Sequence, residues 1–181
     1  MMRQGVWILI FILGGCGGVA APEPKTFDLG LNAPSTGLPA VRIASVRAAA
    51  PFEGTDMRYR LAWRNASELA SFANSLWAAP PAELLRKQLL RASHDGVGKC
   101  TLEIELHEFT QVFASKETSE ARVELRGWLA GRSGRFASRG WSVAEPNAGA
   151  DPVSGAAAFA RAADRAIGEI AGWIAAQPDC R

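Results

Sequence analysis

The stretch Thr101–Phe113, T-L-E-I-E-L-H-E-F-T-Q-V-F, decides the fold of this chain. Its first half alternates strictly between apolar and charged side chains, which predicts a β-strand with one buried face and one solvated face. The parity of the apolar positions then changes between Leu106 and Phe109. A β-bulge or a bend near His107 or Glu108 would reconcile the two halves.

Four more strands are predicted around this one. Residues 121–130 and 135–143 are joined by the turn signal G-R-S-G, so together with 101–113 they predict an antiparallel meander. Upstream, residues 41–47 and 57–64 also suit strands. The second of these alternates basic residues with four apolar ones: Met57, Tyr59, Leu61 and Trp63.

Two helices complete the predicted domain. One begins after Pro80, because Pro81 suits a first helical turn and Glu83 complements the positive end of the helix dipole. The other begins after Asp151, a favourable N-cap, and repeats apolar residues at spacings of three and four as far as Ile174. These elements predict an α+β fold, a two-layer sandwich in which a mainly antiparallel sheet carries both helices on one face.

The start of the chain contains a targeting signal. Arg3 is followed by the apolar run Val6–Leu13, which as a helix is about 12 Å long and too short for a hydrocarbon core of about 30 Å. The L-G-G-C at 13–16 resembles a bacterial lipobox, which implies cleavage before Cys16 and acylation of this cysteine. The alternative is an ordinary cleaved signal with a cysteine near its cut.

This interpretation divides the chain into three parts. Residues 1–15 are a signal peptide, residues 16–39 are the lipidated cysteine with a proline-rich tether, and residues 40–181 form a single α+β domain. Within the tether only residues 26–29 look able to join a sheet edge. The lipobox resemblance implies a diacylglycerol on the Cys16 sulfur and a third acyl chain on its new amine. Three acyl chains hold a protein on a membrane durably, so we expect a domain that is tethered and does not span the membrane.

The remaining cysteines and the charge narrow the function further. If Cys16 carries the lipid, two cysteines are left, Cys100 and Cys180. In an exported chain an even number of cysteines favours a disulfide between them; two separate thiols are the alternative. The whole chain has 20 basic and 18 acidic residues, and removal of the signal takes away only the basic Arg3. This near balance argues against nucleic acid as a partner.

No catalytic, cofactor-binding or metal-binding residue is predicted, and we expect a protein that is not an enzyme. Neither His94 nor His107 has a visible set of partner ligands, and His107 extends a polar strand face. The stretch S-H-D-G-V-G-K-C at 93–100 departs from a phosphate-binding loop at both ends and precedes a strand.

Three basic residues, Arg58, Arg60 and Arg64, could bind anionic headgroups or an acidic partner. Pairing across strands is favoured, with carboxylates such as Glu103, Glu105 or Glu124.

Three patterns occur in order along the chain: Y-R-L-A-W at 59–63, S-L-W-A-A-P-P-A-E-L-L at 75–85 and L-E-I-E-L-H-E-F-T-Q-V-F at 102–113. With the lipobox they resemble the ABC-type transport auxiliary lipoprotein family, which includes the paraquat-inducible protein C lipoproteins. The match runs from about residue 27 to residue 173. The residues that mark it are Trp77, Pro80, Pro81, Phe109, Gln111 and Phe113.

The resemblance implies an outer-membrane lipoprotein that faces the periplasm. Gly17, where a lipoprotein retained in the inner membrane would have aspartate, is compatible with this location. The implied partners are the MCE-domain protein, permease and ATPase of a transport system for lipids or other apolar molecules. The chain would dock the end of an MCE-protein tunnel, and a homo-oligomeric ring of its own copies belongs to the same expectation.

Two other functions stay open at this point. One is direct carriage of a lipid in an apolar cavity of a few hundred cubic ångströms between helices and sheet. The other is regulation of a cell-envelope enzyme. Lipid carriage predicts bound lipid in extracts of the purified domain. Neighbouring genes separate regulation from transport, because permease and ATPase genes favour transport and a cell-wall synthase gene favours regulation.

Overall fold

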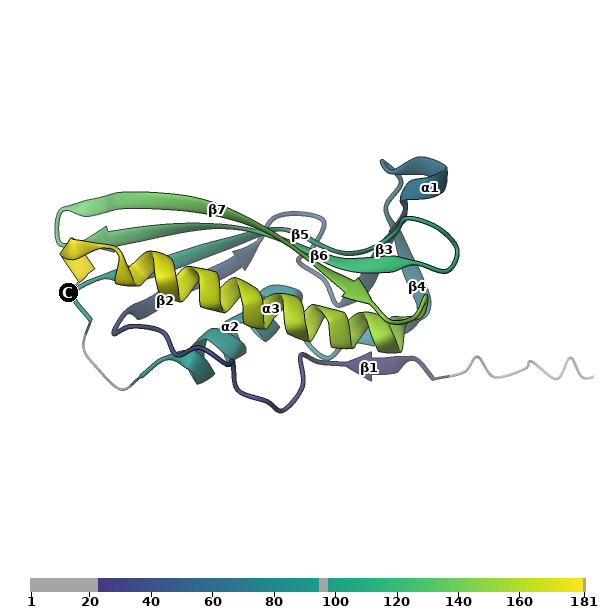
Figure 1. The fold of residues 1–181 in the computed structure, drawn as a ribbon, viewed down its shortest axis with the longest axis horizontal. Coiled ribbons are helices and arrows are strands. Elements are labelled where there is room, and N and C mark those ends of the chain that lie inside the picture. Colours follow the sequence, from purple (N-terminus) through teal and green to yellow (C-terminus); the bar gives the residue numbers. More distant parts are fainter. Residues whose placement is uncertain (1–22, 95–97, 181) are drawn as a thin grey trace, which may run out of the picture.

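The computed structural model describes residues 23–94 and 98–180, and these form one seven-stranded sheet with helices packed against it (Figure 1). The strands are β1 (Lys25–Phe27), β2 (Arg42–Ala48), β3 (Asp56–Leu61), β4 (Ala70–Trp77), β5 (Thr101–Phe113), β6 (Ser119–Gly131) and β7 (Gly134–Asn147). The helices are α1 (Ala62–Asn65), α2 (Pro81–Ala92) and α3 (Pro152–Ala175), and the 3-10 turn η1 (Pro178–Cys180) follows α3. The strand order is β1-β4-β3-β5-β6-β7, and β2 also pairs with β5.

The meander β5-β6-β7 is confirmed, and so is the bulge within β5. Both pairings are antiparallel, and the register of β5 against β6 shifts between Leu106 and Glu108. The shift keeps Ile104, Leu106 and Phe109 buried although their parity differs. One inserted residue therefore reconciles the two halves of the stretch 101–113.

The predicted mainly antiparallel sheet with two helices is wrong. β5 pairs in parallel with β2 along its first half and with β3 along its second half, and β1 pairs in parallel with β4. The sheet is mixed, and the described residues form three helices. The sequence reading missed β4, because its exposed and small residues hide the period of two. β4 returns antiparallel to β3 and α2 follows it, so β5 enters the sheet parallel to β2 and β3.

The predicted strand 57–64 also ends early. β3 stops at Leu61, and the next four residues form α1, which packs on β3 and β5. Trp63 therefore leaves the apolar strand face on which the alternation placed it, and 46% of its surface is exposed. Alternation continues through Trp63 in the sequence, but the backbone has already turned.

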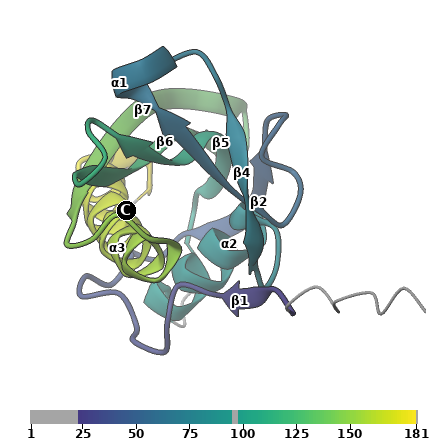
Figure 2. The same ribbon diagram turned by 90° about the vertical axis from the view of Figure 1, so that its right-hand side faces the viewer.

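The two longer helices lie on the same side of the sheet (Figure 2). α2 packs mainly on β2, and α3 packs on β6 and β7. Asp151 caps α3 and Pro152 is its first residue, as predicted. Gly127 in β6 permits close packing beneath α3, since a Cβ there would lie 2.8 Å from the ring of Trp141.

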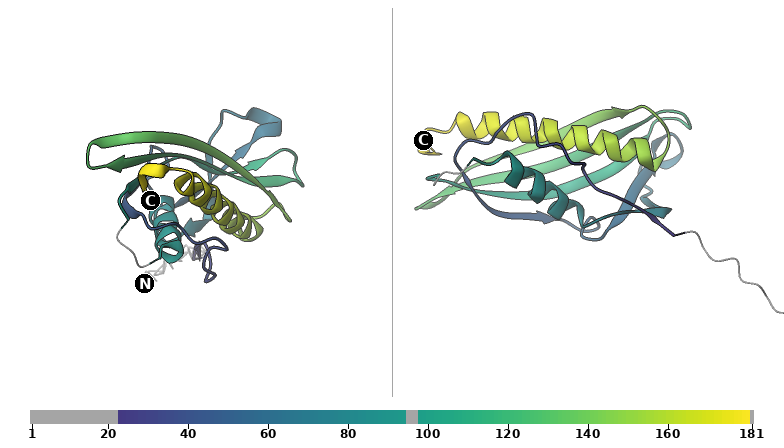
Figure 3. Two further views of the ribbon diagram at one scale, coloured as in Figure 1. Left: turned by 60° about the vertical axis from the view of Figure 1, so that its left-hand side comes forward. Right: turned by 90° about the horizontal axis from the view of Figure 1, so that it is seen from below.

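The segment before β2 is largely part of the folded domain. β1 joins the sheet beside β4, and Leu29 and Leu38 are buried. The chain from β1 to β2 crosses the helices on the side away from the sheet (Figure 3). Cys16 and the predicted signal peptide lie outside the described residues.

Candidate functional site

The elongated domain has two different ends (Figure 1). At one end lie β1, where the N-terminal chain enters the fold, and α1. At the other end lie the β6–β7 turn and η1. We call these the near end and the far end.

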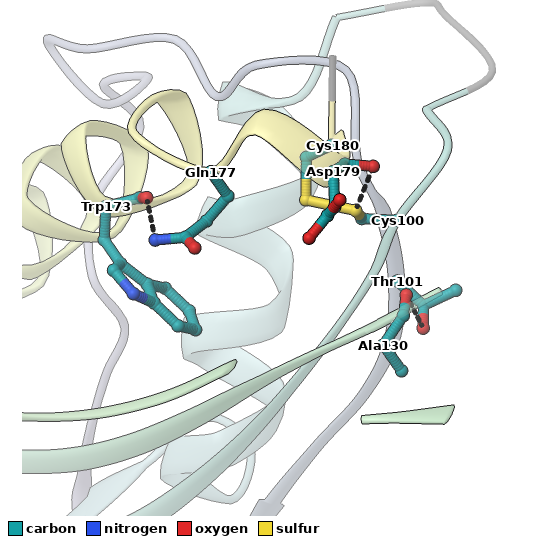
Figure 4. The surroundings of a disulfide bond; sticks show 7 residues. All are labelled: Cys100, Thr101, Ala130, Trp173, Gln177, Asp179 and Cys180. Carbon is teal, nitrogen blue, oxygen red and sulfur yellow. Dashed lines mark hydrogen bonds between the residues drawn. A yellow bond between two sulfur atoms is a disulfide. The ribbon is translucent and has the colours of Figure 1, made fainter. Parts of the chain in front are cut away.

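A disulfide between Cys100 and Cys180 organises the far end (Figure 4). Their Cα atoms are 5.1 Å apart, and Cys100 is buried at the start of β5. Gln177 donates its side-chain amide to the carbonyl of Trp173 at 3.2 Å, which holds the turn after α3. The end of the chain is thus fastened to the sheet beside the β6–β7 turn.

A hollow of about 580 Å³ lies elsewhere, between residues 28–35 and the two longer helices. The lipid-carrier hypothesis requires a cavity between helices and sheet. This hollow lies on the outer side of the helices and has small and polar walls, among them Ala160, Asp164 and Gln88. Its position differs from the one that hypothesis requires.

The far-end hollow is the candidate site. It measures about 760 Å³ and lies between the β6–β7 turn and the disulfide-linked chain end. Its lining is Gly98, Lys99, Gly131, Arg132, Ser133, Gly134, Arg135, Phe136 and Asp179. Gly134 has φ of 104°, a conformation that favours glycine and closes the turn tightly.

The far-end hollow combines positive charge with an exposed aromatic ring. Phe136 is 40% exposed, and Lys99 and Arg132 form no ion pair within residues 23–94 and 98–180. Arg135 is different, because it pairs with Glu103 and its guanidinium lies 4.8 Å from the ring centroid of Trp128. The hollow therefore offers two cations without an ion-pair partner in the described residues and one apolar ring, with the carboxylate of Asp179 also on its wall. This excess of positive charge suits an acidic protein segment with an apolar anchor.

The sequence reading did not single out Lys99, Arg132 or Phe136. It identified the turn G-R-S-G only as a connection between strands. The signal was a basic residue inside this turn and an arginine and a phenylalanine directly after it. Only the fold brings Lys99 and the chain end beside them.

The residues that mark the family resemblance form the core at the near end. The ring centroids of Trp77 and Phe109 are 5.3 Å apart, and those of Phe109 and Phe159 are 4.3 Å apart. Phe113 belongs to a second cluster, in which its ring lies 6.0 Å from that of Tyr59. Packing between sheet and α3 thus explains Trp77 and Phe109, and packing among neighbouring strands explains Phe113.

The polar and proline members of this set also have structural roles. Gln111 is fully buried and donates its amide to the hydroxyl of Ser119 at 2.9 Å and to the carbonyl of Asp151 at 3.4 Å. It therefore joins β5 to β6 and to the start of α3. Pro80 and Pro81 occupy the N-cap and first position of α2.

Of the three basic residues, Arg60 alone pairs across strands in the described part of the chain, with a partner other than those expected, while Arg58 pairs within its own strand. Arg60 pairs with Glu108 at 3.2 Å and Arg58 with Asp56 at 2.8 Å, while Arg64 forms no ion pair in the part of the chain that the structure describes. The carboxylates expected as partners, Glu103, Glu105 and Glu124, do not pair with these arginines in the described residues. Glu103 pairs with Arg135, and Glu105 lies by Arg47.

The two histidines are apart from each other. Nδ1 of His94 is 3.0 Å from the carbonyl oxygen of Leu38, and Nε2 of His107 is 3.4 Å from the carboxylate of Glu105. Across residues 23–94 and 98–180, His, Cys, Asp and Glu side chains form no group of three that could hold a metal ion. None of the described helices combines the length and apolarity needed to cross a membrane.

No protein-family model matches this sequence, and no curated protein matches it. Solved structures do. A Xanthomonas campestris protein described under the family model DUF330 has a TM-score of 0.66 and 23% identity, over 82% of this chain and 93% of that chain. An uncharacterized protein has a TM-score of 0.58 and 16% identity, over 84% of this chain and 99% of that chain. The chain therefore shares the fold of these two proteins.

Proposed function

We propose that this protein is a lipid-anchored accessory subunit of an MCE-type ABC transport system. In this proposal Cys16 anchors it to the outer membrane, and the domain faces the periplasm. Its far-end hollow docks the MCE-domain protein, whose permease and ATPase move lipids or other apolar molecules. The lipobox and the sequence patterns given above support the assignment. The fold shared with the DUF330 protein is compatible with it.

One observation carries the docking part of the proposal: the N-terminal chain enters at one end of the domain and the far-end hollow lies at the other (Figure 1). A domain held by Cys16 would therefore keep Phe136 and its neighbouring cations away from the anchoring membrane. This is where a partner that reaches across the periplasm would meet it.

The anchor also lowers the affinity that docking requires. A tethered domain searches a surface and meets its partner at a high effective concentration, so a small interface suffices. Lys99 and Arg132 would steer an acidic segment toward the hollow, and Phe136 would supply the apolar contact. The disulfide keeps these groups in place before docking, which lowers the entropy cost of binding.

Crosslinking in cells tests this proposal. A photoreactive phenylalanine derivative replaces Phe136 in one strain. In the control strain it replaces Val153, which is 55% exposed at the start of α3, toward the near end. The MCE-domain protein is expressed together with each variant, and mass spectrometry identifies the crosslinked partner.

We expect the MCE-domain protein to be captured from position 136 and not from position 153. The charge reversals Lys99→Glu and Arg132→Glu should lower the yield at 136 without changing the amount of protein in the membrane. If neither position captures an MCE-domain protein while the protein is lipidated and abundant, the proposed function is wrong. Equal capture at both positions contradicts the far-end hollow as the docking site.

A further inference from the structure

We infer that α1 forms a second membrane contact, in which Trp63 enters the headgroup region of the bilayer that holds the lipid anchor. Arg64 and Lys116 flank it and face the phosphates. The inference rests on the proposed anchoring at Cys16 and adds a site that orients the domain. Its ligand is a phospholipid surface.

The register of β1 places the start of the described chain and α1 at the same end. β1 runs parallel to β4 with Lys25 beside Ser75, so the chain before Lys25 heads toward Ala70, the end of β4 next to α1. At a rise of about 3.3 Å per residue, Ala70 lies about 17 Å beyond Ser75. β1 and α1 lie toward the same end of the long axis (Figure 1), and viewed from that end they lie at opposite edges of the domain (Figure 2).

The length of the N-terminal chain is sufficient for this arrangement. Cys16 and Lys25 are nine residue steps apart, 25 minus 16. At about 3.3 to 3.6 Å per step, an extended chain of this length spans at most about 30 Å. A chain of this length can therefore place the anchor level with α1 or beyond it.

The chemistry of α1 suits the interface between headgroups and acyl chains. Trp63 is 46% exposed although it is one of the largest apolar side chains. Tryptophan prefers this interface, because its ring is apolar and its N–H can still find a polar partner. Nζ of Lys116 lies 5.9 Å from the centroid of the Trp63 ring, so a cation and the ring share one surface.

The charges around Trp63 are arranged for anionic headgroups. Neither Arg64 nor Lys116 forms an ion pair anywhere in residues 23–94 and 98–180. The neighbouring carboxylate of Glu117 accepts a hydrogen bond from Ser115 within its own loop, at 3.1 Å. Basic side chains near an anionic membrane surface are attracted to it.

The structure also holds α1 rigidly enough to act as a contact. Arg60 donates to the carbonyl of Ala66 at 3.4 Å, directly after α1, and the same guanidinium pairs with Glu108 of β5. The side chain of Asn65 accepts from the backbone N–H of Ser67 at 3.1 Å. With the tether as one attachment and α1 as the other, the long axis of the domain would point away from the membrane.

Fluorescence quenching by brominated lipids tests the contact. The full lipidated protein is reconstituted into phosphatidylethanolamine and phosphatidylglycerol vesicles, with or without bromine on the acyl chains near the headgroup. Three proteins are compared: the unchanged protein, Trp63→Phe, and the matched control Trp128→Phe. Trp128 is a partly exposed tryptophan on β6, near the far end. Mass spectrometry of each sample measures the lipidation of Cys16.

We expect brominated lipids to quench part of the tryptophan emission of the unchanged protein. Trp63→Phe should abolish this quenched component, and Trp128→Phe should retain it. If lipidated protein shows no quenching, or if the quenching survives Trp63→Phe, the membrane contact is wrong. If a photoreactive group at position 63 then captures a protein, α1 is a protein interface instead. If Cys16 is not lipidated, the proposed function itself fails, which the mass spectrum shows separately.

Discussion

Single polar residues tie the two layers of this domain together. Gln111 and Asp151 meet at the start of α3, where the amide of Gln111 donates to the Asp151 carbonyl. The carboxylate of Asp151 accepts hydrogen bonds from the backbone N–H of Val153 at 2.8 Å and of Ser154 at 3.0 Å. It also accepts one from the Ser154 hydroxyl at 2.7 Å. These bonds satisfy donors that a helix start leaves unpaired.

The hydrogen bond from the Ser154 side chain, followed by the backbone bonds, lowers the pKa of Asp151 below its ordinary value. A carboxyl with a lowered pKa stabilises the fold fully above its unfolded pKa, and the stabilisation disappears as the pH falls through the folded pKa. The affected window therefore begins at about pH 4 and extends downward. Asp151→Asn keeps an acceptor for the helix start but removes the titrating charge.

We expect Asp151→Ala to lower the free energy of unfolding by about 1 kcal/mol at neutral pH. Asp151→Asn should cost less at neutral pH, and its difference from the unchanged protein should shrink below about pH 4. Urea unfolding at pH 7 and pH 3 measures both effects. A difference between Asp151→Asn and the unchanged protein that does not depend on pH would contradict the assigned role of the charge.

Among the elements, η1 depends most on a covalent link. It is only three residues long and has no buried residue of its own, and Cys180 within it bonds to Cys100 at the start of β5. The bond closes a loop with a sequence separation of 80. In the chain-entropy account a loop of this size contributes about 4 kcal/mol, because the link restricts the unfolded chain.

We expect the double substitution Cys100→Ser and Cys180→Ser to lower the free energy of unfolding by up to about 4 kcal/mol. Urea unfolding with and without a reductant measures the change. The reduced unchanged protein should resemble the double variant, and the variant itself should not respond to reductant. Identical unfolding midpoints for the oxidised protein and the double variant would show that the link adds no stability.

For the whole molecule, the separation of its two ends defines how it would work. The near end combines the entry of the N-terminal chain with α1, and the far end presents Lys99, Arg132 and Phe136. A mixed sheet keeps the two ends apart as one rigid body, because β5 and β6 run its full length as 13-residue strands. A domain of this shape can contact a membrane at one end and bind a partner at the other.

The anchor itself is tested by localisation. Cys16→Ala should move the protein from the membrane fraction to the soluble periplasmic fraction, because no acyl chain can be attached. Gly17→Asp should keep the lipid but shift the protein from the outer to the inner membrane on a density gradient. Mass spectrometry of the unchanged protein should find its mature N-terminus at an acylated Cys16. An unmodified N-terminus elsewhere would contradict the anchor.

The sequence by itself determined features that depend on neighbouring residues. Alternation predicted β5, the parity change at Leu106 predicted the bulge, and Asp151 predicted the start of α3. The presence of two cysteines besides Cys16 favoured the disulfide between Cys100 and Cys180 that the structure contains. Each of these signals comes from a few neighbouring residues or from the number of cysteines in the chain.

The tertiary structure alone decided the parallel pairings, the strand β4, the turn of Trp63 into α1 and the assembly of the far-end hollow. β4 has little alternation of its own, and its place in the sheet comes from backbone pairing with the preceding strand β3 on one side and the distant β1 on the other. Lys99 and Arg132 are far apart in the chain. They line one hollow only because the start of β5, the end of β6 and the disulfide-linked η1 lie at the same end of the molecule. The physical reason is that backbone hydrogen bonds between strands are the same for any sequence. Periodicity therefore identifies a strand, but only packing of the whole chain selects its neighbours.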